Sequence, residues 1–247
     1  MARKDRITTP GFYHIINRGV EKRNIFVSPS DYDKFLELLD TMREAFDIIV
    51  HSYCLMTNHY HLLLQTQDEN ISDAIKYLNS NYSMYFNKQY KRTGHLWQGR
   101  FLSYYLYDDA HFWIVAKYIE RNPIKANMVQ KIHQYRYQSF FQWKYKSTYM
   151  NLLENSMIFD MTLNEYETYL SSELDDKILD KVFETQKMVK QKDGTIKILY
   201  KRLETFFDED RDINRNANIK KAYEYGYTKT QIADFLELST KTISKHI

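Results

Sequence analysis

The sequence lacks several features that would place it in a specialised class of protein. Its one cysteine, Cys54, cannot form a disulfide within the chain, which fits a reducing, cytoplasmic environment. No apolar run approaches 18 residues, so we expect no membrane span. The segment 1–6 is charged and no apolar stretch follows it, so we also expect no secretory signal.

The sequence also has little excess of charge of either sign, because 35 Lys and Arg are nearly balanced by 32 Asp and Glu. A net charge of +3 does not establish a nucleic-acid partner. The six glycines form no phosphate-binding loop. Aromatic residues are abundant at 16%, with 22 tyrosines among them. Such rings can stack on unpaired bases, although composition alone favours a half-buried tyrosine shell around an ordinary core.

The apolar periodicity predicts seven elements in the first part of the chain. Strands are expected at 13–17, 48–56, 59–66 and 97–106. Helices are expected at 30–46 with Ser30 as N-cap, at 72–86 with Ser72 as N-cap, and at 112–122, ended by Pro123. The first six elements follow the β-α-β-β-α-β order of the ferredoxin-like fold. We therefore predict an α+β domain over residues 1–140, with an antiparallel sheet and helices, followed by a mostly helical C-terminal region.

The remainder of the chain divides into two further parts. We predict a helical charged linker over 141–205, because acidic and basic blocks alternate from residue 165 onward. Residues 206–247 resemble a helix-turn-helix, with Thr228 as an N-cap, a short turn at 237–239 that lacks glycine, and a last helix over 240–247. That helix would present Lys241 and Lys245 to DNA. The alternative is a small helical cap on the main domain.

Two pairs of residues carry candidate chemistry. His59 and His61 are two apart on a predicted strand, so both imidazoles project from one face and could bind one divalent ion. Tyr118 and Asn122 are four apart on a predicted helix and share a face. The plainer alternative makes the histidines hydrogen-bonded core residues, Tyr118 a core side chain and Asn122 a helix cap. Spacing alone favours that alternative.

Four sequence blocks resemble the REP-associated tyrosine transposase branch of the single-tyrosine HUH transposase family. They are GFYHIINRG at 11–19, NHYHLLL at 58–64, GHLWQGRF at 94–101 and YIERNPIKA at 118–126. Their order and spacing cover about residues 8–130. Thr57 departs from the family, whose members often have proline there, and Tyr60 is a bulky residue between the two histidines.

The resemblance implies a function and assigns roles to the two pairs. His59 and His61 would bind a divalent ion, Mg²⁺ or Mn²⁺, with Asn122 as the third ligand. Tyr118 would be the nucleophile that cleaves and rejoins single-stranded or hairpin DNA through a covalent 5′-phosphotyrosine intermediate. The expected partner is DNA with repeat elements, the expected location is the nucleoid in the cytoplasm, and the expected state is a monomer or a homodimer.

Basic and aromatic residues between 88 and 100 are candidates for contact with that DNA: Lys88, Lys91, Arg92, Trp97 and Arg100. The alternative is a solvated loop around a buried Trp97. At the level of function, two other hypotheses remain. One is a catalytically silent DNA-binding regulator, against which the intact set of histidines, tyrosine and asparagine argues. The other is a metal-dependent hydrolase that acts on another substrate.

Overall fold

The computed structural model describes residues 8–106, 109–174, 188–190, 196–198, 203, 206–207 and 214–247. The chain forms two compact units, Met1–Leu179 and Asp180–Ile247, which we describe separately. Within the described residues, no helix combines the length and the apolar character that a bilayer-crossing segment needs.

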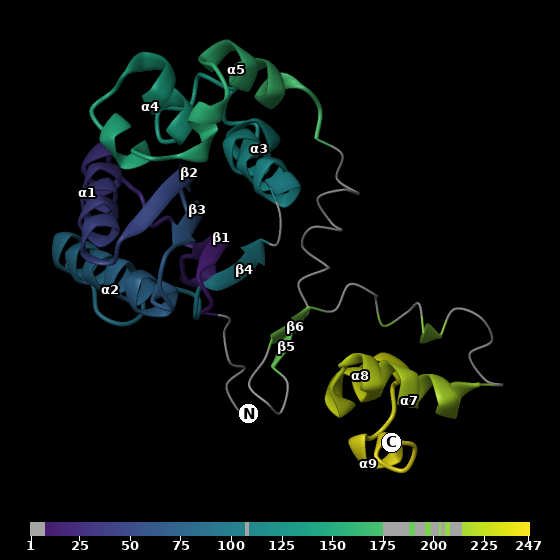
Figure 1. The fold of residues 1–247 in the computed structure, drawn as a ribbon. Helices are drawn as coiled ribbons and strands as arrows, with labels where there is room; N and C mark the ends of the chain where they lie inside the picture. The colour runs from purple at the N-terminus through teal and green to yellow at the C-terminus, as the bar shows by residue number, and fades with distance from the viewer. Residues whose placement is uncertain are drawn as a thin grey trace. The chain divides into compact units, whose positions relative to one another are not determined.

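The first unit is built on a four-stranded antiparallel sheet (Figure 1). Its strands are β1 (Gly11–Arg18), β2 (Ile48–Met56), β3 (His59–Thr66) and β4 (Leu102–Leu106). They lie in the order β2-β3-β1-β4, so β3 and β1 are central and each is paired on both sides. This order, together with the connecting helices, is the ferredoxin-like arrangement, and the predicted α+β fold class is confirmed.

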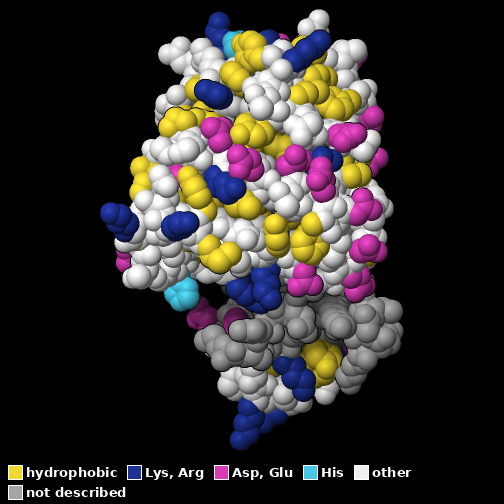
Figure 2. All heavy atoms as spheres, turned by 90° about the vertical axis from the view of Figure 1, so that its left-hand side faces the viewer, with side chains coloured by type: hydrophobic (Ala, Val, Ile, Leu, Met, Phe, Trp, Pro, Cys, Tyr) yellow, Lys and Arg dark blue, Asp and Glu magenta, His cyan; other side chains and the backbone are white. Residues whose placement is uncertain are grey.

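Helices α1 (Pro29–Ala45) and α2 (Ile71–Gln89) cover one face of the sheet (Figure 1). Between them and the sheet lies an aromatic core in which Phe35 contacts both Tyr60 of β3 and Tyr82 of α2. On their outer surface, basic and acidic side chains are interspersed (Figure 2), with ion pairs such as Lys34–Glu37.

The opposite face of the sheet is covered by α3 (Asp109–Lys125) (Figure 1). Phe112, Val115 and Ile119 bury the apolar stripe of this helix. Further helices follow α3: α4 (Ser139–Tyr145), the short 3₁₀ helices η2 (Met150–Leu153) and η3 (Met157–Asp160), which contact β2, and α5 (Leu163–Ser171), which contacts α3. Another 3₁₀ turn, η1 (Val20–Lys22), follows β1.

Several element ends differ from the sequence prediction. Helix α1 is capped by a reciprocal Ser28–Asp31 capping box rather than by Ser30, and α2 begins directly after Asn70 rather than at Ser72. Strand β4 starts at Leu102, because residues 97–101 make only an isolated bridge between Trp97 and Gly19. Helix α3 continues through Pro123 to Lys125. A proline prevents one backbone hydrogen bond but does not always end a helix.

The first part of the predicted linker belongs to the first unit. Apolar side chains in η2, η3 and α5 are fully buried there: Leu152, Leu153, Ile158, Tyr166 and Leu170. The unit therefore extends beyond the expected boundary at 140, because these residues complete the core on the α3 side of the sheet. Farther along, β5 (Met188–Lys190) and β6 (Ile196–Ile198) form an antiparallel pair. Most of the predicted linker beyond residue 174 lies outside the described residues.

The second unit contains α7 (Arg215–Tyr225), α8 (Lys229–Leu236) and α9 (Thr240–Ile243) around a small core. Ile219, Tyr227, Ile232 and Ile243 are buried in it. The turn between α8 and α9 begins at Glu237, which adopts the left-handed conformation with φ 55°. Helix α9 has four residues, and Lys245 lies in the turn that follows it, so the predicted helix over 240–247 is too long.

Candidate active site

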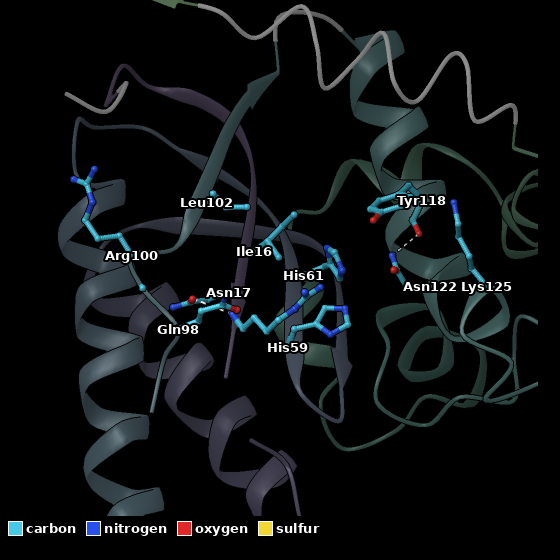
Figure 3. Close-up of a pocket in the computed structure, with 12 residues that line it drawn as sticks. Ile16, Asn17, His59, His61, Gln98, Arg100, Leu102, Tyr118, Asn122 and Lys125 are labelled. Carbon is cyan, nitrogen blue, oxygen red and sulfur yellow. Dashed lines mark hydrogen bonds between the residues drawn. The ribbon is translucent and has the colours of Figure 1, made fainter. Parts of the chain in front are cut away.

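A cleft of about 590 Å³ opens where β3 and the end of β1 face α3 (Figure 3). It brings His59 and His61 together with Tyr118 and Asn122, the two pairs singled out in the sequence. Its full lining is Ile16, Asn17, Arg18, His59, His61, Gln98, Gly99, Arg100, Leu102, Tyr118, Asn122 and Lys125.

The alternation of β3 explains why the two histidines share the cleft. Their ring centroids are 5.0 Å apart, and both rings lie on the α3 side of the sheet. Tyr60, between them, points to the opposite side, where its hydroxyl donates to Asn79 Oδ1 at 2.8 Å. The bulky residue in the middle position is thus a core side chain of the α1–α2 face and does not fill the cleft.

Each histidine has a partner on its Nδ1 atom. His59 Nδ1 lies 2.6 Å from Asn58 Oδ1, and the amide nitrogen of Asn58 donates to the Lys22 carbonyl. Because Asn58 Oδ1 can only accept, His59 carries its proton on Nδ1 and its lone pair on Nε2. His61 Nδ1 lies 3.0 Å from His14 Nε2. His61 Nε2 is buried and has no hydrogen-bond partner in the described part of the chain.

Both imidazoles are neutral near pH 7. Burial lowers the pKa of His59 to about 4, with a further contribution from the Arg18 guanidinium. Burial also holds the pKa of His61 well below its usual value, and the neighbouring His14, His59 and Arg18 add to the effect. A neutral imidazole is the form that binds a metal, so desolvation keeps both side chains ready to act as ligands.

Helix α3 brings Tyr118 and Asn122 to the cleft from the other side (Figure 3). The ring of Tyr118 meets the ring of His61 edge-on, with centroids 5.5 Å apart. Asn122 Nδ2 donates to the carbonyls of Tyr118 at 2.8 Å and Ile119 at 3.4 Å. Pro123 lacks the N–H that would otherwise bond to Ile119, so the asparagine amide replaces it. With Nδ2 used in this way, Oδ1 is the atom with which Asn122 would bind a ligand.

The hydroxyl of Tyr118 is a phenol rather than a phenolate at neutral pH. Burial raises its pKa above the usual value of 10, while the Lys125 ammonium and a hydrogen bond from Asn122 act in the opposite direction. Additional positive charge in the cleft would therefore favour the nucleophilic, ionised form.

A buried carboxylate fixes α3 to the rest of the unit. Glu120 is fully buried, and it accepts hydrogen bonds from the Ser52 hydroxyl at 2.9 Å, from the Ser139 hydroxyl and from the Phe140 N–H. Burial raises its pKa to about 7, although these three hydrogen bonds oppose the shift. Ser52 reaches it because the register of β2 shifts between Val50 and Ser52. Glu120 thus connects the helix that carries Tyr118 to the sheet and to α4.

The donor set fits a divalent ion of the kind predicted. The described residues contain no group of three or more His, Cys, Asp and Glu that could hold a metal. The candidate ligands are instead two imidazole nitrogens and one amide oxygen, at His59, His61 and Asn122. The unpartnered, buried Nε2 of His61 is an atom that such an ion would satisfy. If these three residues held the ion, its other ligands would have to come from phosphate oxygens or water.

The predicted DNA contacts near residue 90 are distributed unevenly around this cleft. Arg100 lines it and also lines a neighbouring hollow, which Trp97 shares. The Trp97 indole N–H donates to the Asn79 carbonyl at 3.0 Å, and its ring packs against Tyr60. The part of the indole that makes these contacts therefore stabilises the fold. Lys88 and Lys91 are exposed at the end of α2. Arg92 lies over the Phe86 ring and donates to Asn87.

Two residues that line the cleft, Arg18 and Lys125, and one that lies next to it, His14, were not singled out from the sequence. His14 contacts His61 from the neighbouring strand β1, and Arg18 ends that strand. Lys125 lies two helical turns after Tyr118, on the same face. All three are within the sequence blocks that resemble the transposases. Their positions in those blocks were the available signal, but spacing along the chain does not show which neighbouring strand or helix they face.

Comparison with known proteins finds similarity to transposases. Residues 9–122 match the family model described as "Transposase IS200 like". Over 99 residues, the chain is 31% identical to a Haemophilus influenzae protein that carries the name REP-associated tyrosine transposase. The match covers 35% of this chain and 56% of that relative, so the chain spans about half the length of the curated relative it matches.

Two solved structures are also similar in part. A REP-associated tyrosine transposase bound to a REP hairpin has 14% identity and a TM-score of 0.49, over 57% of this chain and 84% of that one. A Deinococcus radiodurans R1 protein described as a transposase has 18% identity and a TM-score of 0.35, over 49% and 97%. The family match and the Haemophilus relative confirm the resemblance seen in the sequence, and residues 9–122 are similar to the IS200-like transposases.

Proposed function

We propose that this protein is a metal-dependent DNA strand transferase that cleaves and rejoins single-stranded or hairpin DNA through Tyr118. The observation that carries the proposal is the convergence on one cleft of His59 and His61 from β3 with Tyr118 and Asn122 from α3. The choice of hairpin DNA follows from the resemblance to REP-associated tyrosine transposases.

The protein residues account for the binding and orientation that the reaction needs. His59, His61 and Asn122 would hold a divalent ion, Mg²⁺ or Mn²⁺, which when bound supplies charge neutralisation and orientation of the phosphate oxygens. Arg18 and Lys125 line the same cleft and add positive charge for a phosphodiester anion. Lys125 also favours ionisation of the Tyr118 hydroxyl.

The covalent step is a transfer of the phosphoryl group between two oxygens. Tyr118 loses its hydroxyl proton and attacks the phosphorus, and the bond from phosphorus to the 3′ oxygen breaks. The 3′ oxygen takes up a proton and leaves as a hydroxyl, while the 5′ phosphate remains on the tyrosine. Attack by a 3′ hydroxyl on this phosphotyrosine reverses the step and regenerates Tyr118. The intermediate conserves the phosphodiester energy, so rejoining needs no nucleotide triphosphate.

An end-labelling experiment tests both the chemistry and its polarity. Hairpin-containing single-stranded DNA is labelled at either the 5′ or the 3′ end, incubated with the protein and Mn²⁺, and analysed under denaturing conditions. We expect the 3′ label to remain on the protein and the 5′ label to be released on a shorter strand. Shortened strands without an adduct would indicate a hydrolase instead. Binding without cleavage would indicate the silent regulator.

A further inference from the structure

His14 lies on β1 beside the proposed ligand His61 and is completely buried. Its Nε2 atom is 3.0 Å from Nδ1 of His61, and the two rings are stacked with centroids 5.2 Å apart and planes 21° from parallel. The register explains this contact, since Ile16 of β1 is opposite His61 and His14 is two residues away on the same face.

The same ring also contacts the helix side of the site. The edge of the Tyr118 ring meets it with centroids 5.9 Å apart, and Tyr104 of β4 stacks on it at the same separation. His14 therefore touches both a proposed metal ligand and the proposed nucleophile, which come from different elements.

The hydrogen bond between the two histidines requires a division of roles. Two neutral imidazoles can share it only if one nitrogen donates and the other accepts. If His61 donates from Nδ1, its lone pair is on Nε2, the buried atom without a partner in the described residues. Histidines that bind metals commonly donate their other N–H to a neighbouring group, which fixes the ring and its tautomer.

We propose that His14 is a positioning residue that accepts the Nδ1 proton of His61, holds the Nε2 lone pair of His61 toward the cleft, and supports the ring of Tyr118. The metal-binding part of this inference rests on the proposed function. The orientation of His61 does not, so the two can be tested apart.

The tautomer of His61 is measured first, in metal-free wild-type protein, by ¹⁵N NMR of the histidine rings. We expect His61 to carry its proton on Nδ1. A proton on Nε2 would overturn the inference, whatever the protein does with metals. This measurement needs no variant, so it stands even if a substitution at His14 prevents folding.

Metal binding is measured next, by titration of DNA-free protein with Mn²⁺ in a calorimeter. His14→Phe keeps a ring of similar size but removes the acceptor, whereas His14→Gln places a polar group near the position of Nε2. We expect His14→Phe to weaken Mn²⁺ binding by about 10- to 100-fold and His14→Gln to restore most of the affinity. Unchanged affinity in His14→Phe, or equal losses in both variants, would overturn the inference.

His51→Phe is the matched control. His51 is also a fully buried histidine, on β2, but it contacts Phe12 and Phe112 and bonds to Gln65 and Ser156. Its replacement should lower thermal stability without changing Mn²⁺ affinity. If wild-type protein has the expected tautomer but binds no Mn²⁺, the proposed metal dependence fails while the positioning of His61 by His14 stands.

Discussion

The two halves of the candidate site are held in different ways. His59 and His61 lie on a central strand with a hydrogen-bonded neighbour on either side, so their spacing and their common face are fixed by the backbone of the sheet. Tyr118 and Asn122 lie on a helix that covers the sheet, and its position depends on side chains. Glu120 anchors it to β2 and α4, while Lys117 and Arg121 bind the end of α5.

This difference shows which part of the site's geometry can be predicted from local sequence patterns. Strand alternation and helical spacing set the geometry inside each half, but neither determines how far apart the halves lie. That distance depends on packing between elements, on the Glu120 anchor and on the contact of His14 with both sides. Experiments on each half should therefore have effects of different kinds.

The helix half should respond most strongly to removal of the proposed nucleophile. Tyr118→Phe loses only the hydroxyl, so its ring can still pack against His61 and His14. We expect the covalent adduct to fall to the level of a protein-free control while DNA affinity is retained, as measured by denaturing electrophoresis and by fluorescence anisotropy. An adduct formed by this variant would assign the chemistry to another tyrosine. The next candidates are Tyr104 and Tyr105 of β4 and Tyr107, which lies outside the described residues.

The sheet half should show a strong but smaller effect. His59→Ala or His61→Ala each removes one proposed ligand, and we expect single-turnover cleavage to fall by about 100-fold or more, since metal-ion catalysis contributes several kcal/mol. Excess EDTA should reproduce the loss in wild-type protein, and added Mn²⁺ should reverse it. Full cleavage in EDTA would disprove the metal dependence.

The Glu120 anchor should make stability depend on pH. Its pKa is raised to about 7 in the fold, so the folded state retains a proton that the unfolded state releases from about pH 4.5 upward. The free energy of unfolding should therefore fall by about 3 kcal/mol relative to Glu120→Gln as the pH rises through this window. Urea unfolding of both proteins at about pH 5 and pH 8 measures the difference.

Glu167→Gln is a control with the opposite sign. The Lys144 ammonium lowers the pKa of Glu167, so its contribution to stability is lost on acidification instead. If Glu120→Gln and wild type show the same pH dependence, the buried carboxylate does not titrate as described.

The smallest effect on cleavage is expected from the second unit, far along the chain from either half. Lys241 and Lys245 are exposed on and after α9. Replacing both with alanine should leave single-strand cleavage unchanged but weaken duplex binding. The slope of log affinity against log salt should decrease by about one for each DNA phosphate that the two lysines neutralise in the wild-type protein. An unchanged slope would indicate a packing role for this unit rather than the proposed helix-turn-helix contact.

The sequence predicted what depends on local pattern. The spans of β2 and β3, the succession of strands and helices along the chain and the shared faces of the two residue pairs all follow from periods of two or about 3.6 residues. The roles of His59, His61, Tyr118 and Asn122 stay predictions. They came from the resemblance, because spacing alone favoured a plain core.

The remainder depends on contacts between residues distant in sequence. His14 meets His61 across 47 positions, and Glu120 meets Ser52 across 68. The register shift in β2 that brings Ser52 to Glu120 has no local sequence signal. Likewise, the apolar residues of η2, η3 and α5 occur in the predicted linker, and only the packing of η2 and η3 against β2 and of α5 against α3 shows them to be core.

The proline within α3 has a consequence for how this site can change through evolution. Pro123 leaves the Ile119 carbonyl without a backbone donor, and the amide of Asn122 takes that place. An alanine at 123 would restore the backbone bond to Ile119 and leave the asparagine amide with the Tyr118 carbonyl as its remaining acceptor. If the Asn122 oxygen acts as proposed, a substitution at Pro123 should change how firmly that oxygen is held, although residue 123 does not line the cleft. The effects of substitutions at positions 122 and 123 should therefore depend on each other.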